Sequence, residues 1–147
     1  MNQRKRQRLY LQLYHDVLDA PAWRAMSVHG RLLYIALRRR HNTKHSNNGD
    51  IFISQREAAK ELKFTRPTIA KGFKEMEHYG FAVMTSPGYL GVDGKGKSPH
   101  WMLTEFEING EPPTRDFERW SGIKFKQKKR AQPRQRTRAF GIEERAS

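Results

Sequence analysis

Apolar residues recur at helical spacing in three stretches of the chain, residues 28–41, 55–62 and 66–79. Each stretch follows a residue whose side chain suits a helix N-cap: Ser27, Ser54 and Thr65. Glu57 stands three positions after Ser54, which is the spacing of a capping box. Gly80 stands where a helix that begins after Thr65 would end. The pattern therefore predicts three helices, with a short turn between the second and the third.

Three shorter runs are rich in β-branched and aromatic residues and predict strands, at residues 51–53, 81–86 and 100–106. The glycine-rich segment 87–99 between the last two predicts a hairpin loop. Residues 9–26 mix aromatic and aliphatic side chains, and Pro21 suits the first turn of a short helix. Beyond the last strand, Phe117 and Trp120 form a small apolar cluster suited to docking on the domain.

This order of elements predicts an α+β fold that is mainly helical, with a three-helix core and a small antiparallel sheet. We expect a basic arm at residues 1–8 and a folded domain at residues 9–122 that includes N-terminal and C-terminal extensions. From Lys124 onward the sequence has no apolar periodicity, so residues 123–147 are predicted to be a basic, mostly disordered tail.

Positive charge is concentrated at the two ends of the chain. The net charge is +14; residues 1–8 carry +4 and residues 124–147 carry +7, which leaves +3 for the 115 residues between. Such ends suit a polyanion, because lysines and arginines that neutralise phosphates release counterions. A solubilising tail has the same composition, so the charge favours nucleic acid only together with the helical pattern.

Several other classes of function find no support in the sequence. The chain has no cysteine, which excludes disulfides, thiolate zinc sites and cysteine nucleophiles. No run approaches the roughly 20 apolar residues that span a bilayer. His41 and His45 are four residues apart, but they flank a helix end and a polar loop, so we read a surface pair rather than a metal site. Without a catalytic constellation we expect no enzyme and no cofactor, and a cytoplasmic, nucleoid-associated protein.

The core spacing resembles that of the winged helix-turn-helix family. The residues that carry the resemblance are Ala59, Leu62, Ile69, Phe73, Met76 and Gly80, followed by Phe81 and Val83 at the start of a strand. It covers residues 27–106, and the wider sequence is similar in style to small proteins of bacterial prophages and plasmids. Lys63 departs from the pattern, because many members have glycine at this turn position; a left-handed lysine there costs about 1 kcal/mol.

The resemblance implies that helix 66–79 enters the DNA major groove and that segment 87–99 is the wing. On a helical wheel, Lys71, Lys74 and His78 lie opposite the core positions. We expect base contacts from Arg66, Thr68 and Lys71, near the start of this helix. Backbone contacts are expected from ten residues: Gln55, Arg56, Lys74, Lys95, Lys97, Lys124, Lys126, Lys128, Lys129 and Arg130.

Two residues in the third helix are poor helix formers, Pro67 and Gly72. Pro67 falls at the second helical position after Thr65, where its missing N–H has no intrahelical partner in any case. Gly72 falls beside the core face, and we expect Ala58 and Ala59 of the preceding helix to approach it closely.

These features together predict a protein that binds double-stranded DNA with a preference for certain sequences and acts as a bacterial or prophage transcriptional regulator. A replication initiator or accessory protein that binds origin repeats is the closest alternative. An RNA-binding or nucleoid-architectural module is the alternative of a different class. Homodimerisation stays open: residues 9–26 or the Phe117 and Trp120 segment would either pair two chains or close the core of one.

Overall fold

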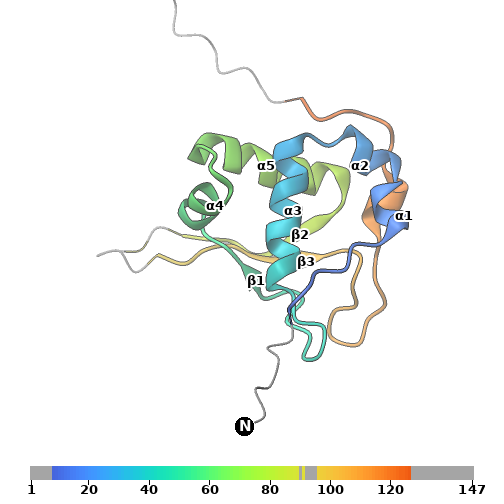
Figure 1. The fold of residues 1–147 in the computed structure, drawn as a ribbon, viewed down its shortest axis with the longest axis horizontal. Helices are drawn as coiled ribbons and strands as arrows, with labels where there is room; N and C mark the ends of the chain where they lie inside the picture. Colours follow the sequence, from blue (N-terminus) through green and yellow to red (C-terminus); the bar gives the residue numbers. More distant parts are fainter. Residues whose placement is uncertain (1–7, 90, 92–95, 127–147) are drawn as a thin grey trace, which may run out of the picture.

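The computed structural model describes residues 8–89, 91 and 96–126 (Figure 1). This part of the chain contains five α-helices: α1 His15–Leu18, α2 Pro21–Ala25, α3 Val28–Arg40, α4 Gln55–Leu62 and α5 Arg66–Tyr79. Three strands, β1 Ile51–Phe52, β2 Ala82–Ser86 and β3 His100–Leu103, form an antiparallel sheet in the order β1-β3-β2. A 3-10 helix, η2 Asp116–Arg119, follows the sheet. The described chain is α+β and mainly helical.

The three predicted helix caps are confirmed. The Ser27 hydroxyl accepts from the Gly30 N–H at 3.3 Å, and the Ser54 hydroxyl accepts from the Glu57 N–H at 3.0 Å. At the third helix, the Thr65 hydroxyl accepts from the Thr68 N–H at 3.4 Å. These contacts satisfy N–H groups that have no partner inside the helix. Gly80 ends α5 with a φ of 81°, a left-handed conformation that suits glycine.

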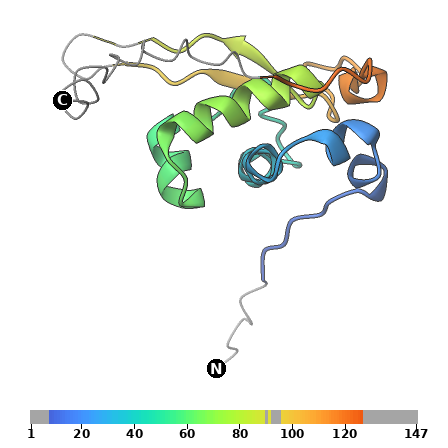
Figure 2. The same cartoon turned by 90° about the horizontal axis from the view of Figure 1, so that it is seen from above.

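The helices pack against one face of the sheet, with α5 next to it (Figure 2). Side chains alternate along β3, so Trp101 and Leu103 are buried while His100 and Met102 are partly exposed. Trp101 stacks on Phe73 of α5, with ring centroids 4.9 Å apart and planes 9° from parallel. This stacking joins the helical layer to the sheet in one core.

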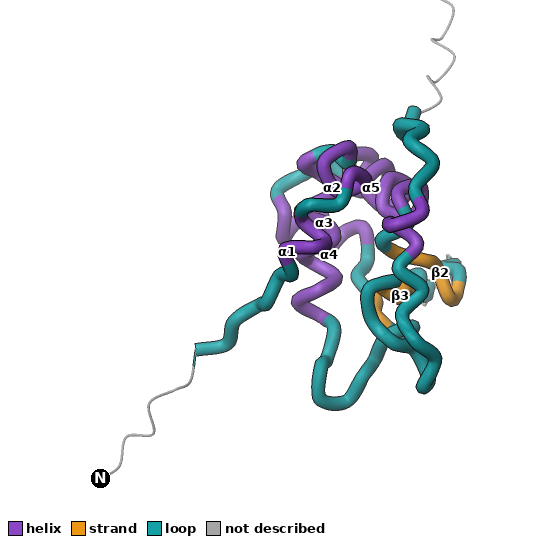
Figure 3. The backbone as a smooth tube through the Cα atoms, turned by 90° about the vertical axis from the view of Figure 1, so that its right-hand side faces the viewer, coloured by secondary structure: helices purple, strands orange, loops and turns teal. Residues whose placement is uncertain are grey.

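Both extensions of the domain pack on Phe81, which follows α5. Trp23 of α2 meets the Phe81 ring edge-on at 5.7 Å, and Phe117 of η2 stacks on it at 5.0 Å. Phe117 is 2% exposed and Trp23 is 8% exposed. These aromatic residues therefore close the core of a single chain, so their apolar surface is already covered within the monomer. Figure 3 shows η2 and the chain after it running beside the helices.

The third strand is shorter than predicted: it ends at Leu103 and not at residue 106. Beyond it the chain turns, and the carboxylate of the buried Glu105 comes within 3.0 Å of Arg38 Nε. Arg38 lies in the last turn of α3, yet its side chain is 3% exposed. A buried charge needs a partner, and this pair fixes the turn to α3.

Gly72 is buried as predicted, but its neighbour is a different helix. A Cβ atom added there would lie 3.2 Å from Leu33 Cδ2 and 3.7 Å from the His29 carbonyl oxygen, both on α3. The expected approach of Ala58 and Ala59 of α4 is therefore wrong. The wheel placed Gly72 beside the core correctly, but the spacing of apolar residues does not indicate which helix occupies that side.

None of the helices within the described ranges is long and apolar enough to cross a bilayer.

Candidate nucleic-acid interface

Helices α4 and α5 are joined by a tight turn at Lys63, the position that departs from the family pattern. Lys63 has φ 60° and ψ 40°, which is the left-handed region. The N–H of Phe64 then donates to the Ala59 carbonyl at 3.2 Å, which closes the end of α4. The lysine therefore adopts the conformation that glycine adopts more easily, at a cost of about 1 kcal/mol.

The start of α5 is stiff and exposed. Pro67 occupies the first turn, where no intrahelical hydrogen bond is lost. The hydroxyls of Thr65 and Thr68 lie 2.9 Å apart, so the Thr68 hydroxyl, which we predicted to contact a base, is also part of the helix cap. Arg66, the residue that follows Thr65, is exposed.

The outward face of α5 continues with the other predicted contacts. Lys74 and His78 are exposed and Lys71 is half-buried. Gln55 and Arg56 are both exposed at the start of α4. The structure thus leaves the predicted residues of both helices accessible, apart from the partial cover over Thr68 and Lys71.

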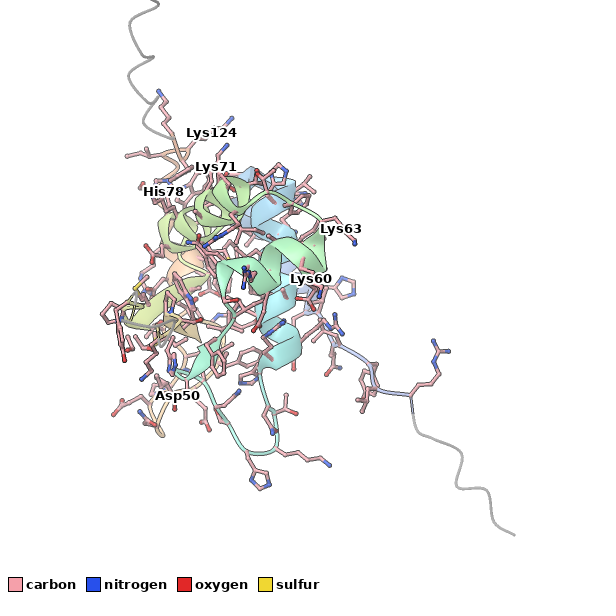
Figure 4. All side chains as sticks on the ribbon, turned by 90° about the vertical axis from the view of Figure 1, so that its left-hand side faces the viewer. Asp50, Lys60, Lys63, Lys71, His78 and Lys124 are labelled. Atoms are coloured by element: carbon pink, nitrogen blue, oxygen red, sulfur yellow. The ribbon has the colours of Figure 1, made fainter. Side chains whose placement is uncertain are left out.

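Two further lysines border the same turn, and the sequence reasoning missed them. Lys60 and Lys63 are exposed and lie at the end of α4 on the face shown in Figure 4. Together with Arg56 they are spaced i, i+4 and i+7, so they share one side of the helix. That spacing was visible in the sequence and would have identified them.

Two of the four carboxylates on α4 and α5 are engaged by residues of α3 and its cap. Glu61 lies 3.1 Å from both Arg39 and Arg40 of α3. Glu75 of α5 points to the other side of its helix and accepts from the Ser27 hydroxyl at 2.5 Å and from the Ser27 N–H at 3.2 Å. Two acidic side chains remain exposed, Glu57 and Glu77. Partial burial raises the pKa of the Glu77 carboxyl, while the charge of Lys74 opposes this shift.

The cations of the two helices are largely unpaired as a result. In the part of the chain that the structure describes, no salt bridge within 4.0 Å involves any of six residues: Arg56, Lys60, Lys63, Arg66, Lys71 and Lys74. An unpaired, exposed cation keeps its full attraction for an external anion. The α4–α5 surface, defined by these six residues, is therefore positive.

The segment between β2 and β3 forms a narrow hairpin where it is described. Tyr89 and Lys97 exchange two backbone hydrogen bonds, each 2.9 Å long. Gly88 allows this close approach, because a Cβ atom there would lie 2.8 Å from the Lys97 carbonyl oxygen. Lys97 is exposed, whereas the predicted contact Lys95 lies outside the described residues.

The C-terminal segment brings two more of the predicted lysines to α5. Lys124 and Lys126 are exposed, and the Ile123 carbonyl between α5 and these lysines accepts from His78 Nε2 at 2.6 Å. Figure 4 shows Lys71, His78 and Lys124 toward the same edge of the molecule. Residues 1–7 of the basic arm and the predicted contacts Lys128, Lys129 and Arg130 lie outside the described residues.

The two histidines predicted as a surface pair differ in the structure, because His41 is half-buried and only His45 is exposed. His41 stacks on Phe106, with ring centroids 4.1 Å apart and planes 8° from parallel. Burial, and secondarily the charge of Arg38, lowers the pKa of His41. The described residues contain no group of three or more histidine, aspartate or glutamate side chains that could hold a metal ion.

Comparison with protein-family models, with curated proteins and with solved structures finds no match to this chain.

Proposed function

We propose that the protein binds double-stranded DNA as a winged helix-turn-helix and acts as a bacterial or prophage transcriptional regulator. The observation that carries the proposal is the α4–α5 surface. Five of its six cations are exposed and Lys71 is half-buried, and none of the six forms a salt bridge within the described chain, while Glu61 and Glu75 of the same two helices are engaged by α3. A surface of this kind suits a polyanion, since the attraction is not already satisfied inside the protein.

The shape of this surface favours duplex DNA. A helix of the size of α5, which has 14 residues, fits the major groove, and its capped start presents Arg66 without competition from an internal carboxylate. Arginine and lysine at this end pair with guanine O6 and N7, which gives sequence preference. The hairpin that holds Lys97 extends from strands β2 and β3, and its lysine supplies a contact to the DNA backbone beside the groove.

The sharpest test separates base reading from phosphate binding. A duplex selected by the full-length protein from a random pool is compared with a scrambled duplex of equal length. If Lys71 contacts a base, Lys71→Ala should reduce the difference in binding free energy between the two duplexes by about 1–3 kcal/mol, which lowers the ratio of the two affinities. Lys74→Ala is the matched control: a phosphate contact weakens binding to both duplexes and leaves the ratio unchanged. An unchanged ratio in Lys71→Ala would remove Lys71 from base recognition.

The regulatory role rests on where the protein binds in a genome. Mapping of its binding sites in the native host should give peaks upstream of genes. Peaks confined to one replication origin would instead support an initiator or accessory protein. If structured RNA competes as well as the selected duplex does, and no discrete peaks are found, an RNA-binding or architectural module is the better description.

A further inference from the structure

Residues 120–126, here called the C-terminal anchor, are held against the last turn of α5. Two donors converge on the Ile123 carbonyl oxygen: His78 Nε2 at 2.6 Å and Trp120 Nε1 at 2.9 Å. The Phe125 N–H donates to the Tyr79 hydroxyl at 3.0 Å. Residues 123–126 of the predicted tail are therefore held beside the end of α5 by these hydrogen bonds.

Aromatic contacts reinforce these hydrogen bonds. The Trp120 ring meets the Tyr79 ring at 5.3 Å, and the Phe125 ring meets the His78 ring at 5.6 Å, both in edge arrangements. Trp120 and Phe125 are partly buried against the core, whereas Lys124 and Lys126 on either side of Phe125 are exposed. The anchor thus fixes Phe125 and leaves a lysine pointing outward on each side of it.

The anchor also changes which part of α5 is open. It contacts the His78 end of the outward face, while Arg66 and Lys74 stay exposed toward the start of the helix. At this end of α5, Lys124 and Lys126 of the anchor add two exposed cations beside the helix. Within the described residues, neither lysine is part of a salt bridge.

We propose that the C-terminal anchor is a phosphate-binding element that holds Lys124 and Lys126 against the DNA backbone beside the groove occupied by α5. This inference rests on the proposed function and adds a structured contact to it. A lysine on a free chain loses conformational entropy when it binds a phosphate, and an anchored backbone reduces that loss. The anchor predicts that the two lysines contribute because of their position as well as their charge.

A double-mutant cycle tests position against charge, with the full chain and the selected duplex as the probe. Lys124→Ala with Lys126→Ala should lower affinity on the order of tenfold at 0.15 M salt and reduce the salt slope by about 1.8, or about 0.9 per phosphate. The anchor is released by Phe125→Ala, and more mildly by Tyr79→Phe, which removes one hydrogen bond and keeps the ring. Lys44→Ala, at an exposed position in the loop between α3 and β1, controls for loss of one positive charge.

If the anchor positions the lysines, the two lysine substitutions should lower affinity less than about threefold when Phe125→Ala is also present, since ordering the released chain then offsets part of each lysine's contribution. Tyr79→Phe should give an intermediate loss, and circular dichroism and thermal unfolding verify that each variant folds. A tenfold loss in both backgrounds, or no loss in either, would overturn the inference while DNA binding itself persists. If the unaltered protein shows neither sequence preference nor salt dependence, the proposed function fails and this inference fails with it.

Discussion

The two sides of α5 both carry charged residues, but they use them differently. On the side facing α3, Glu75 is buried and bonded to Ser27, and Gly72 brings the helices into contact. On the outward side, Arg66 and Lys74 are exposed and have no salt-bridge partner among the described residues. Charge inside the fold is matched by a specific partner, while charge outside is left available. Substitutions on the inner side should therefore change stability, and those on the outer side should change binding.

The largest expected effect concerns the buried pair of Arg38 and Glu105. Arg38→Met leaves the Glu105 carboxylate without a partner and removes a guanidinium that lies 4.7 Å from the Phe106 ring centroid. Breaking a buried pair in this way costs about 3–5 kcal/mol of unfolding free energy when the remaining group stays charged, so the comparison is made above pH 7, where the Glu105 carboxyl is ionised. Urea unfolding measures the loss. The matched control is Arg39→Met, next in sequence and 64% exposed, which should cost less than about 1 kcal/mol. Similar losses in the two variants would contradict the buried pair.

Glu105 also predicts the direction of a pH dependence. Burial raises the pKa of its carboxyl from 4.5 to about 7, against the opposing charge of Arg115. Between these values the native protein holds a proton that the unfolded chain has lost, so the contribution of Glu105 to stability is full below pH 4.5 and is lost as pH rises through 7. The contribution of this group is about 3 kcal/mol. Unfolding free energies measured from pH 4.5 to 7 should decline in the natural protein and decline less in Glu105→Gln. Equal slopes would assign the decline to other groups.

A smaller effect distinguishes two glycines at the contact of α3 with α5. A Cβ atom at Gly30 would lie 2.6 Å from Met26 Cγ and 2.9 Å from Glu75 Oε2, both in the buried interior. Gly30→Ala should therefore lower stability by about 1–3 kcal/mol through overpacking. Gly72→Ala meets only the end of the Leu33 side chain, at 3.2 Å. Its strain is offset by a gain of about 0.5–1 kcal/mol in helix propensity, so thermal unfolding should change little. The reverse ranking would contradict the geometry of this helix pair.

The sequence predicted the elements of this fold well because their signals are local. Ser27, Ser54 and Thr65 each mark a helix start by the hydrogen bond that they accept, and Gly80 marks an end by its left-handed backbone. A cap depends on a few neighbouring residues only, so it can be read from the sequence. The element order and the caps were therefore predictable, and so was the burial of Ile69 and its apolar neighbours.

What the sequence could not show depends on residues that are far apart in the chain. Arg38 meets Glu105 across 67 positions, and Glu75 meets Ser27 across 48. Nothing in either local pattern indicates the partner, so these charges looked like surface residues. The same limit explains the wrong neighbour of Gly72 and the missed C-terminal anchor. For the candidate interface, the sequence predicted which residues face outward. It did not show which carboxylates of α4 and α5 are bonded to other parts of the fold.

The last and smallest effect concerns Lys63, a residue that bears on both stability and binding. Lys63 holds the turn between α4 and α5 in a left-handed conformation and also contributes a cation to the α4–α5 surface. Lys63→Gly should raise the unfolding free energy by about 1 kcal/mol, because glycine adopts this conformation without strain. If Lys63 contacts a phosphate, the same substitution should lower the salt slope for DNA binding by about 0.9.

Lys60→Gln separates these two consequences. It removes a neighbouring exposed cation from a regular helical position, so it should lower the salt slope by a similar amount without a gain in stability. A loss of stability in Lys63→Gly would contradict the strained turn. An unchanged salt slope would mean that Lys63 only shapes the turn and does not touch DNA. A protein that becomes more stable while it binds DNA less tightly would show that the strained lysine is retained for binding, since glycine serves the fold better at this position.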